Sequence, residues 1–453
     1  MTCSRRSLIK SGALALVAGS SFAQVITAAT PAAARARGPR RPFTGYGELV
    51  ADPNGLLDLP RGFSYRVFSR EGDPLSTSGL VPASHDGMAA FSAGFWGTWL
   101  VRNHEIDGSD IEEDGLTPVP HVPGHVYDPE GVGGTTTLLV GHDRKLRDHR
   151  VSLGGTLNNC AGGPTPWDTW LTCEEDDSVL SKPHGYVFEV DPFRGGNPEP
   201  IVGMGRFEHE AVAFDRRGRA YLTEDADSPH GCFYRFVPRR AHGGRGSLHA
   251  GGELSAMAVA GVDTDLSIVQ TPGIVLPVRW IPVPNADPGE DEITVREQAI
   301  ALGATPIQKA EGVWTALDGS VWFVSSRGDG PDAEDEEDVS AAVHAGQIWR
   351  YDPHAQTIEL VVLLAKDSPF DGPDNITAGP HGFALACTDG EDDQWLIGVT
   401  DDGGTFPFAL NPAGDDEFAG ATFSPDGETL FVNIQASPAL TFAVFGPWRH
   451  RAR

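Results

Sequence analysis

The sequence predicts an all-β fold, a β-propeller of about six blades with loop insertions. Short apolar runs recur along the 453-residue chain and are separated by Gly, Pro, Asn and Asp. The chain contains 55 Gly and 35 Pro, which suit turns and interrupt helices. An apolar segment, a turn with Asp and Gly, and a further apolar segment recur at wide intervals, as they do in propeller blades. A β-sandwich or several β-domains would give similar runs, but the repetition favours a single propeller.

The clearest strand candidates are short runs rich in β-branched and aromatic residues. They span residues 97–101, 136–140, 186–190, 220–223, 320–324, 347–351, 358–362 and 429–433. Helical periodicity is scarce, and residues 297–302 form one of the few candidates. The nearly continuous Asp, Glu and small residues at 330–338 predict an exposed acidic loop, and residues 239–252 a polar, Gly-rich insertion.

The N-terminus has the features of an export signal. The paired arginines Arg5 and Arg6 precede an apolar run over residues 14–25, which is too short and too rich in Ala, Gly and Ser to span a membrane. The arginine pair favours the twin-arginine export machinery over an ordinary Sec signal. We therefore expect residues 1–40 to be a signal peptide and linker, and residues 41–453 to be a single domain that is secreted or held in the periplasm or cell envelope.

The charge balance excludes one class of partner. The formal net charge is -29, and the signal region is basic, so the remaining chain is more acidic still. Binding to a nucleic-acid backbone needs clustered Lys and Arg, and is not expected here. The acidity has two interpretations, a solvated surface or carboxylates that converge on cations such as calcium. Beyond the signal, the sequence has no segment apolar enough to predict a stable membrane span.

Cysteine usage also leaves two interpretations. Cys3 belongs to the signal region, and Cys160, Cys173, Cys232 and Cys387 have no zinc-site spacing. In an oxidising compartment one or two disulfides are the ordinary expectation. A thiolate bound to a metal is the alternative, and Cys160 is its candidate.

Several short motifs place carboxylates or amides beside predicted turns, where side chains can converge at the mouth of a propeller. They lie at residues 103–105, 156–167, 169–175, 207–211, 222–225, 309–312, 373–376 and 417–420. Each motif alone is weak, because a carboxylate after a strand is usually solvated. The sequence has no Gly-x-Ser-x-Gly elbow, no Walker loop and no His-Glu-x-x-His motif, so it does not indicate the chemistry of those sites.

Taken together, the motifs resemble the PhoX-type alkaline phosphatases. The matching segments occur in the family's order and cover most of the chain: NCAGGPTPW at 159–167, WLTCEE at 170–175, GRFEHE at 205–210, PDN at 373–375, and residues 423–448. The resemblance implies a β-propeller whose channel mouth binds iron and calcium ions. It also implies hydrolysis of small-molecule phosphate monoesters outside the cytoplasm.

The resemblance assigns roles to residues at the matching positions. Cys160 would be the thiolate ligand of Fe³⁺, with Glu210 and Glu311 as its carboxylate ligands. The Ca²⁺ ligands would be Glu174, Asp374 and Glu105. Further members of the metal site would be Asn375, Glu224 and Asp225, and the catalytic residues would be Lys309 and Asn159.

Two positions depart from the family's pattern. The family usually has Arg-Pro-Glu where this chain has Lys309-Ala310-Glu311. The arginine is expected to contact the substrate phosphate, and Lys309 keeps the charge but loses the bidentate fork. Glu208 stands where a lysine is common. Two alternatives to the phosphatase stay open. One is a calcium-binding propeller that hydrolyses other esters or lactones, and the other is a propeller that only binds a partner. A thiolate bound to a metal would distinguish the phosphatase from both.

Overall fold

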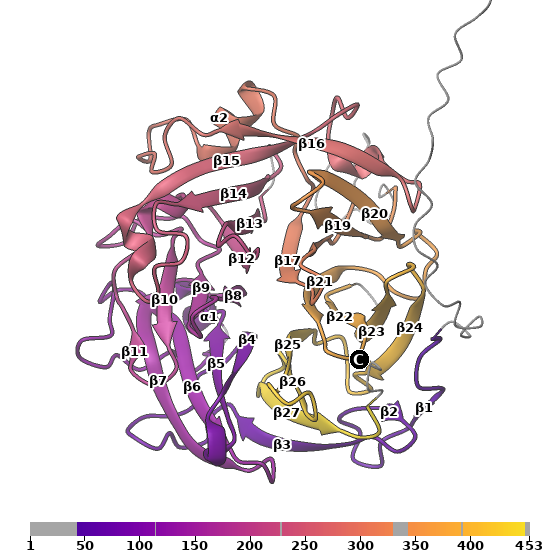
Figure 1. Ribbon diagram of the computed structural model, residues 1–453. Coiled ribbons are helices and arrows are strands. Elements are labelled where there is room, and N and C mark those ends of the chain that lie inside the picture. Colours follow the sequence, from indigo (N-terminus) through magenta and orange to yellow (C-terminus); the bar gives the residue numbers. More distant parts are fainter. Residues whose placement is uncertain (1–42, 114, 227–228, 329–342, 391–392, 449–453) are drawn as a thin grey trace, which may run out of the picture. The chain divides into compact units, whose positions relative to one another are not determined.

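Almost every regular segment of the structure is a β-strand (Figure 1). The structure is a computed structural model that describes residues 43–448 apart from 114, 227–228, 329–342 and 391–392. The predicted signal at 1–40 and the predicted acidic loop at 330–338 lie outside the described residues. The described residues between 43 and 448 belong to one compact unit. No helix in the described part of the chain is both long and apolar enough to cross a membrane.

Four of the antiparallel sheets have four strands each. One contains β4 (His85–Ser92), β5 (Thr98–His104), β6 (Gly133–Val140) and β7 (Leu146–Thr156). The next contains β8 (Gly162–Pro164), β9 (Trp170–Cys173), β10 (Val187–Asp191) and β11 (Gly195–Gly196). Another contains β21 (Pro373–Ala378), β22 (Phe383–Thr388), β23 (Trp395–Thr400) and β24 (Thr405–Leu410). The last contains β25 (Phe418–Phe423), β26 (Leu430–Ile434), β27 (Leu440–Phe445) and β3 (Ser64–Arg70).

A nine-stranded sheet holds two further groups of four. The first is β12 (His209–Phe214), β13 (Ala220–Glu224), β14 (Phe233–Pro238) and β15 (Gly252–Val259). The second is β17 (Ala310–Thr315), β18 (Val321–Ser325), β19 (Gln347–Asp352) and β20 (Thr357–Leu363). The long strand β16 (Val275–Pro282) pairs with β15 along one part and with β20 along the other. The groups surround a common centre, which confirms the predicted β-propeller (Figure 1).

The remaining elements are short. They are β1 (Leu49–Val50), β2 (Leu59–Pro60), α1 (Gly108–Glu113), α2 (Val295–Ala301) and the 3-10 turns η1 (Gly94–Trp96), η2 (Val202–Met204), η3 (Ser247–Ala250) and η4 (Leu266–Ile268). The predicted helix at 297–302 is confirmed as α2, which begins with a capping box between Thr294 and Glu297. The predicted strand runs all fall on strands. The insertion at 239–252 is the β14–β15 connection.

The strand nearest the centre of each group packs directly on its neighbours. A Cβ at Gly163 of β8 would lie 1.5 Å from the backbone oxygen of Val212, and one at Gly312 of β17 would lie 2.8 Å from the Cα of Asn375. Because these backbones touch, only glycine fits at such crossings. The inner strands are therefore held at fixed spacing around the centre.

The last group is closed by the N-terminal strand β3, which pairs with β27 near the end of the chain. A fully buried arginine, Arg102 on β5, ties this closure to the neighbouring group. Its Nη1 donates to Ser69 of β3 at 3.0 Å and to Thr441 of β27 at 2.6 Å. The two ends of the described chain are thus joined by strand pairing and by side-chain hydrogen bonds.

The expected disulfides are absent from the described chain. Cys160, Cys173, Cys232 and Cys387 are all buried as free thiols. Cys173, Cys232 and Cys387 fill space in apolar clusters as small hydrophobic residues, whereas Cys160 packs on a cluster and also lines the cavity described below. The expectation of one or two disulfides is wrong for these residues, and each thiol keeps its sulfur unbridged.

The contact at Gly163 gives a stability prediction. Gly163→Ala should lower the free energy of unfolding by about 3 kcal/mol, since the added methyl group collides with the Val212 backbone and the inner strands must separate. Urea unfolding followed by tryptophan fluorescence measures the change. Gly289→Ala is the matched control, because its Cβ would meet only Glu292, at 4.0 Å. Equal stability of the two variants would contradict the close packing.

Candidate metal centre

Four inner strands carry a carboxylate at the same position. Asp86, Glu210, Glu311 and Asp374 are each the second residue of β4, β12, β17 and β21. In each strand the pairing register shifts directly after the first residue, as at a β-bulge. A bulge re-aims the side chains beside it. The four carboxylates are thereby set at the same end of the inner strands, around the centre.

A second set of polar side chains follows the partner strands. Glu105 and Asp389 come directly after β5 and β22, and Asp225 comes directly after β13. The first residues of the inner strands pair with the last residues of these partners, for example His209 with Glu224 and Pro373 with Thr388. Asp86, Glu210 and Asp374 therefore each have an acidic counterpart in the second set, whereas the counterpart of Glu311 is Ser326, which follows β18 and donates a hydrogen bond to Glu311.

The two sets enclose a cavity of about 130 Å³. Its lining contains nine carboxylates, one thiol, one ammonium group and one hydroxyl group. The lining residues are Asp86, Glu105, Cys160, Glu175, Glu210, Asp225, Lys309, Glu311, Ser326, Asp374, Asp389 and Glu417. Acidic side chains are seldom buried unless they are paired or bound to cations, so this density of carboxylates needs a physical explanation.

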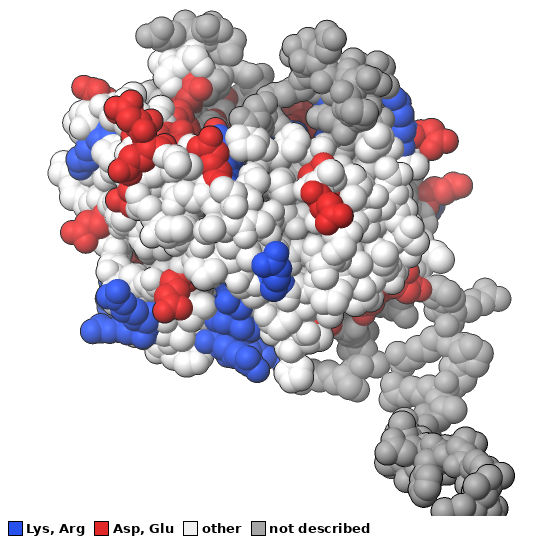
Figure 2. All heavy atoms as spheres, turned by 90° about the horizontal axis from the view of Figure 1, so that it is seen from above, with Lys and Arg blue, Asp and Glu red and all other residues white. Residues whose placement is uncertain are grey.

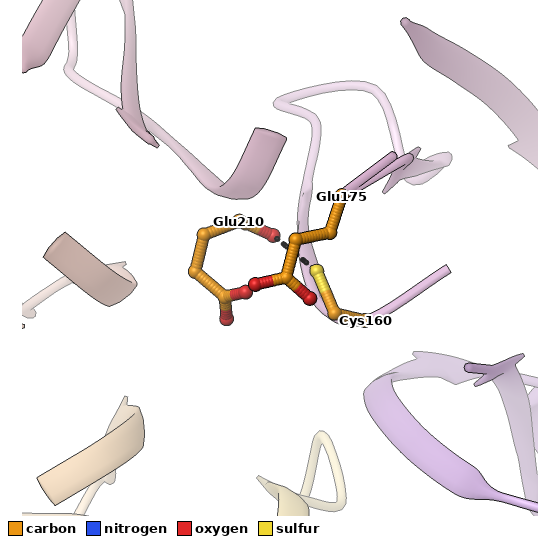
Figure 3. Close-up of side chains that lie close together, drawn as sticks. All are labelled: Cys160, Glu175 and Glu210. Carbon is orange, nitrogen blue, oxygen red and sulfur yellow. Dashed lines mark hydrogen bonds between the residues drawn. The ribbon is translucent and has the colours of Figure 1, made fainter. Parts of the chain in front are cut away.

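Cys160 precedes β8 and points its sulfur into the cavity. Its Sγ–H donates to the backbone oxygens of His209 at 3.3 Å and of Glu210 at 3.5 Å. Figure 3 shows this thiol beside the carboxyl groups of Glu175 and Glu210. One ligand atom from each of the three residues lies within 4.8 Å of the other two. Such spacing lets a single cation contact all three.

Two further sets of three ligand atoms meet the same distance limit. They are Glu175, Asp225 and Glu311, and Glu210, Glu311 and Asp374. Both sets offer only oxygen atoms. Glu175, Glu210 and Glu311 each belong to two sets, so these positions are adjacent and could share ligands.

Burial and mutual repulsion dominate the electrostatics of the cavity. Burial raises the pKa of Glu210 well above its ordinary value, and the neighbouring charges of Asp374 and Glu311 raise it further. The pKa values of Glu311, Asp374 and Glu417 are raised by burial and by nearby carboxylates in the same way. Burial, followed by the charge of Glu210, also raises the pKa of the Cys160 thiol. Added positive charge would favour the ionised forms of these groups.

Unpartnered buried atoms test whether cations fit here. Asp86 Oδ1, Glu210 Oε1 and Asp225 Oδ1 are buried and accept no hydrogen bond from the described residues. Buried polar atoms normally have a partner, and orphaned carboxylate oxygens that line one cavity are suited to a metal ion. The donor set of carboxylates with one thiol fits a mixed site for a transition metal and a hard cation.

Lys309 brings a positive charge to the cavity. Its Nζ lies 2.8 Å from Asp225 Oδ2, and its side chain is 31% exposed. The backbone of Lys309 has φ of 45°, which is unusual for a residue with a side chain and sets the entry into β17. The ammonium group therefore lies at the accessible side of the cavity, two residues before Glu311.

Several residues expected from the sequence line this one cavity. They are Cys160, Glu210, Glu311, Asp374, Glu105, Asp225 and Lys309. The other expected residues, Glu174, Glu224, Asn159 and Asn375, are not in its lining. They lie one residue away from cavity residues and make hydrogen bonds that hold the frame.

Glu174 is fully buried beside the cavity residue Glu175. Its carboxylate accepts hydrogen bonds from His184 Nδ1 at 2.6 Å and from the backbone nitrogens of Gly185 and Tyr186. Its oxygens are therefore occupied by donors of the chain, and the next residue, Glu175, faces the cavity instead. Adjacent residues of an extended segment point to opposite sides, which accounts for the difference.

Glu224 and Asp225 behave in the same way: Glu224 is held by donors of the chain, and Asp225 lines the cavity. Glu224 accepts hydrogen bonds from Tyr234 at 2.5 Å and from Arg296 at 3.2 Å, and burial raises its pKa to about 7. Asn375 donates to Asp374 Oδ2 and accepts from the backbone of Gly420, which links β21 to β25.

Asn159 has both ends of its amide occupied within the chain. It accepts from Thr156 at 2.5 Å and donates to Thr172 at 2.9 Å. These bonds fix the backbone just before Cys160. A direct role for Asn159 with substrate remains a prediction, and its contacts describe a residue that positions the thiol.

Sequence reasoning did not assign Asp86, Glu175, Asp389 or Glu417 to the site. Asp86-Gly87-Met88 repeats the acidic–small–aliphatic order of Glu210-Ala211-Val212 and Glu311-Gly312-Val313, so this signal was present in the sequence. Glu175 and Glu417 lay within the quoted motifs without a role. Asp389 directly follows β22, the partner of inner strand β21. Its place beside Asp374 is recognised only once the pairing of these two strands is known.

Comparison with known proteins identifies the family. A family model described as "Alkaline phosphatase PhoX" matches residues 44–150 and 141–438. The chain belongs to this family. No curated protein matches the chain. Membership supports a phosphatase that acts on a small-molecule phosphate ester, and it confirms the resemblance inferred from the motifs.

Solved structures share the fold. The structure of Pseudomonas fluorescens PhoX in complex with vanadate, a transition-state analogue, aligns with a TM-score of 0.66 at 19% identity, over 86% of this chain and 96% of that one. A gluconolactonase from Xanthomonas campestris aligns with a TM-score of 0.45 at 10% identity, over 88% of this chain and 98% of that one. The first likeness supports the PhoX-type propeller.

The raised carboxylate pKa values predict how the metal-free protein responds to pH. The folded state binds more protons than the unfolded state between the ordinary Glu value of 4.5 and the raised folded values, so stability should fall as pH rises through this window. Thermal unfolding in chelator should therefore give a higher midpoint at about pH 5 than at about pH 8. Glu210→Gln should reduce the difference, since it removes one repelling charge. A midpoint that rises over this range would contradict the prediction.

Proposed function

We propose that the protein hydrolyses phosphate monoesters at this cavity, with Fe³⁺ and Ca²⁺ bound by its thiol and carboxylates. The observation that carries the proposal is the enclosed set of nine carboxylates and one thiol, with buried oxygens that lack partners. Family membership supports the reaction class. The geometry supports the choice of ligands.

The donor sets favour different cations at different positions. Cys160 with Glu175 and Glu210 combines a thiolate with carboxylates, which suits iron. The sets around Glu311 and Asp374 offer oxygen alone, which suits calcium. Glu311 belongs to the two oxygen-only sets, and it shares one of them with Glu210, which also belongs to the thiolate set, so we keep Glu311 as a ligand candidate for either ion.

The bound ions would supply concentrated positive charge for the phosphoryl oxygens and would make a water molecule more acidic. The residues of the chain provide the rest. Lys309 at the accessible side would bind a phosphate oxygen, and Asp225 orients its ammonium group. A cavity of about 130 Å³ is small beside the roughly 300–1,000 Å³ of drug-sized ligand sites, so the alcohol part of the ester would stay outside. We therefore expect broad tolerance of the leaving alcohol.

We also propose that the protein is exported through the twin-arginine route, as Arg5, Arg6 and the apolar run suggest. That route carries folded proteins, so the iron could be bound before export.

Changing the thiol tests the iron assignment. Cys160→Ala should remove the visible absorption of a ferric thiolate, lower the iron content and abolish hydrolysis of a generic aryl phosphate in the presence of calcium. Absorption spectra, elemental analysis and phosphate release measure the three effects. Cys387→Ala is the control, since this buried thiol lies on β22 outside the cavity lining. Colourless, iron-free but active wild-type protein would contradict the assignment.

Changing the lysine tests its role in binding phosphate. Lys309→Met should lower kcat/KM by about 10²-fold or more, because a positive charge aimed at the phosphoryl oxygens is lost. Lys309→Arg should keep the charge and restore a bidentate fork, so activity should be equal or higher. Lys145→Met, an exposed change outside the cavity lining, is the control. Activity within twofold of wild type in Lys309→Met would refute the role.

A further inference from the structure

The end of the propeller opposite the metal cavity is formed by turns of known position. The inner strands start at the cavity and run away from it, so the β4–β5 and β12–β13 turns lie at the other end, as the pairs Ser92–Thr98 and Phe214–Ala220 require. Strand alternation places the β6–β7, β10–β11 and β14–β15 turns at the same end. We call the part of this end that residues 93–97, 141–150, 191–196, 215–219 and 239–251 form the far face; the turns of the later blades lie at the same end but outside it.

Exposed aromatic side chains gather on the far face. Phe95 and Trp96 on η1 are 88% and 70% exposed, and their rings are in edge contact at 5.8 Å. Phe193, in the β10–β11 turn, is 56% exposed and contacts Trp99 at 5.9 Å. Of the large hydrophobic side chains exposed in the described chain, the aromatic ones are these three. Aromatic rings placed at turn tips, away from the core, mark a binding surface.

Basic residues surround these rings, although the whole chain has a net charge of -29. Residues 141–150, 191–196, 215–219 and 239–251 together contain eleven Lys and Arg but four Asp. The corresponding turns of the later blades, at 316–320, 352–357, 400–405 and 424–429, contain six Asp and Glu and no Lys or Arg. In Figure 2, several Lys and Arg side chains gather along the lower edge, whereas a group of Asp and Glu lies at the upper left.

We propose that the far face docks on an anionic lipid bilayer. Phe and Trp rings favour the interface between headgroups and acyl chains, and Lys and Arg beside them are attracted to anionic lipids. The acidic cavity end would be repelled by the same surface. The protein would therefore bind with its cavity turned toward the solution, where phosphate esters are free to enter. This inference does not depend on the reaction at the cavity.

Vesicle sedimentation tests the docking directly. The purified protein should partition onto vesicles of phosphatidylglycerol and phosphatidylcholine, but far less onto pure phosphatidylcholine, and salt should weaken the binding. Phe95→Ser with Trp96→Ser should lower the partition coefficient about tenfold, since two interfacial rings are removed. Lys145→Glu with Arg217→Glu, both exposed, should lower it about tenfold on the anionic vesicles alone.

A matched variant controls for loss of any exposed apolar group. Ile268→Ser with Leu302→Ser changes two side chains, each 53% exposed, that lie outside the far face, and it should bind as wild type does. Circular dichroism and thermal unfolding establish that each variant is folded. Failure of the wild type to bind anionic vesicles at low salt would overturn the proposal. Binding of the aromatic variant equal to that of the wild type would also overturn it. So would a wild-type dimer in analytical ultracentrifugation that becomes monomeric in the aromatic variant, because the far face would then be a dimer interface.

Discussion

Mutual repulsion among buried carboxylates is the constraint on which this structure depends. Nine carboxylates line one cavity, and the buried ones are Asp86, Glu210 and Glu311. Burial and the charges of neighbouring carboxylates raise the pKa values of Glu210 and Asp374. Such a cluster would push flexible segments apart. The propeller resists this because its inner strands touch, as at Gly163 and Val212, and because β3 closes the ring against β27. The rigid propeller thus keeps the carboxylates close together despite their electrostatic repulsion, and bound cations would reduce that repulsion.

The frame also explains why consecutive acidic residues have different tasks. At two strand ends the first carboxylate turns outward and is held by the chain, as Glu174 is by His184 and Glu224 is by Arg296. The next residue, Glu175 or Asp225, faces the cavity. The outer carboxylate fixes the backbone that carries the inner one. Supporting contacts of this kind decide the orientation of metal ligands and are part of a metal site's design.

Sequence patterns predicted the fold and about half of the cavity lining. Strand runs and Asp-Gly turns were sufficient for the propeller, because each blade repeats local signals. Family motifs led to Cys160, Glu210 and Glu311. The sequence analysis chose Glu174, whereas Glu175 lines the cavity, because which of the two points inward depends on the orientation of an extended segment. Asp389 was out of reach for a different reason: it joins the site through the pairing of β21 with β22, a contact that no local pattern contains.

The neighbours of Lys309 explain how a lysine could act where the family usually has an arginine. Its ammonium group is held by Asp225, a residue that also belongs to one of the oxygen-only ligand sets. In the proposed loaded state a cation would compete for that carboxylate, and the ammonium group would be released toward the accessible side, where a phosphate enters. The lysine ammonium group is a point charge with rotatable donors, so it can leave Asp225 and turn to a phosphate oxygen. Asp225 would then bind the metal while Lys309 binds the phosphate. This exchange is compatible with the family's reaction although the chain lacks the family's arginine.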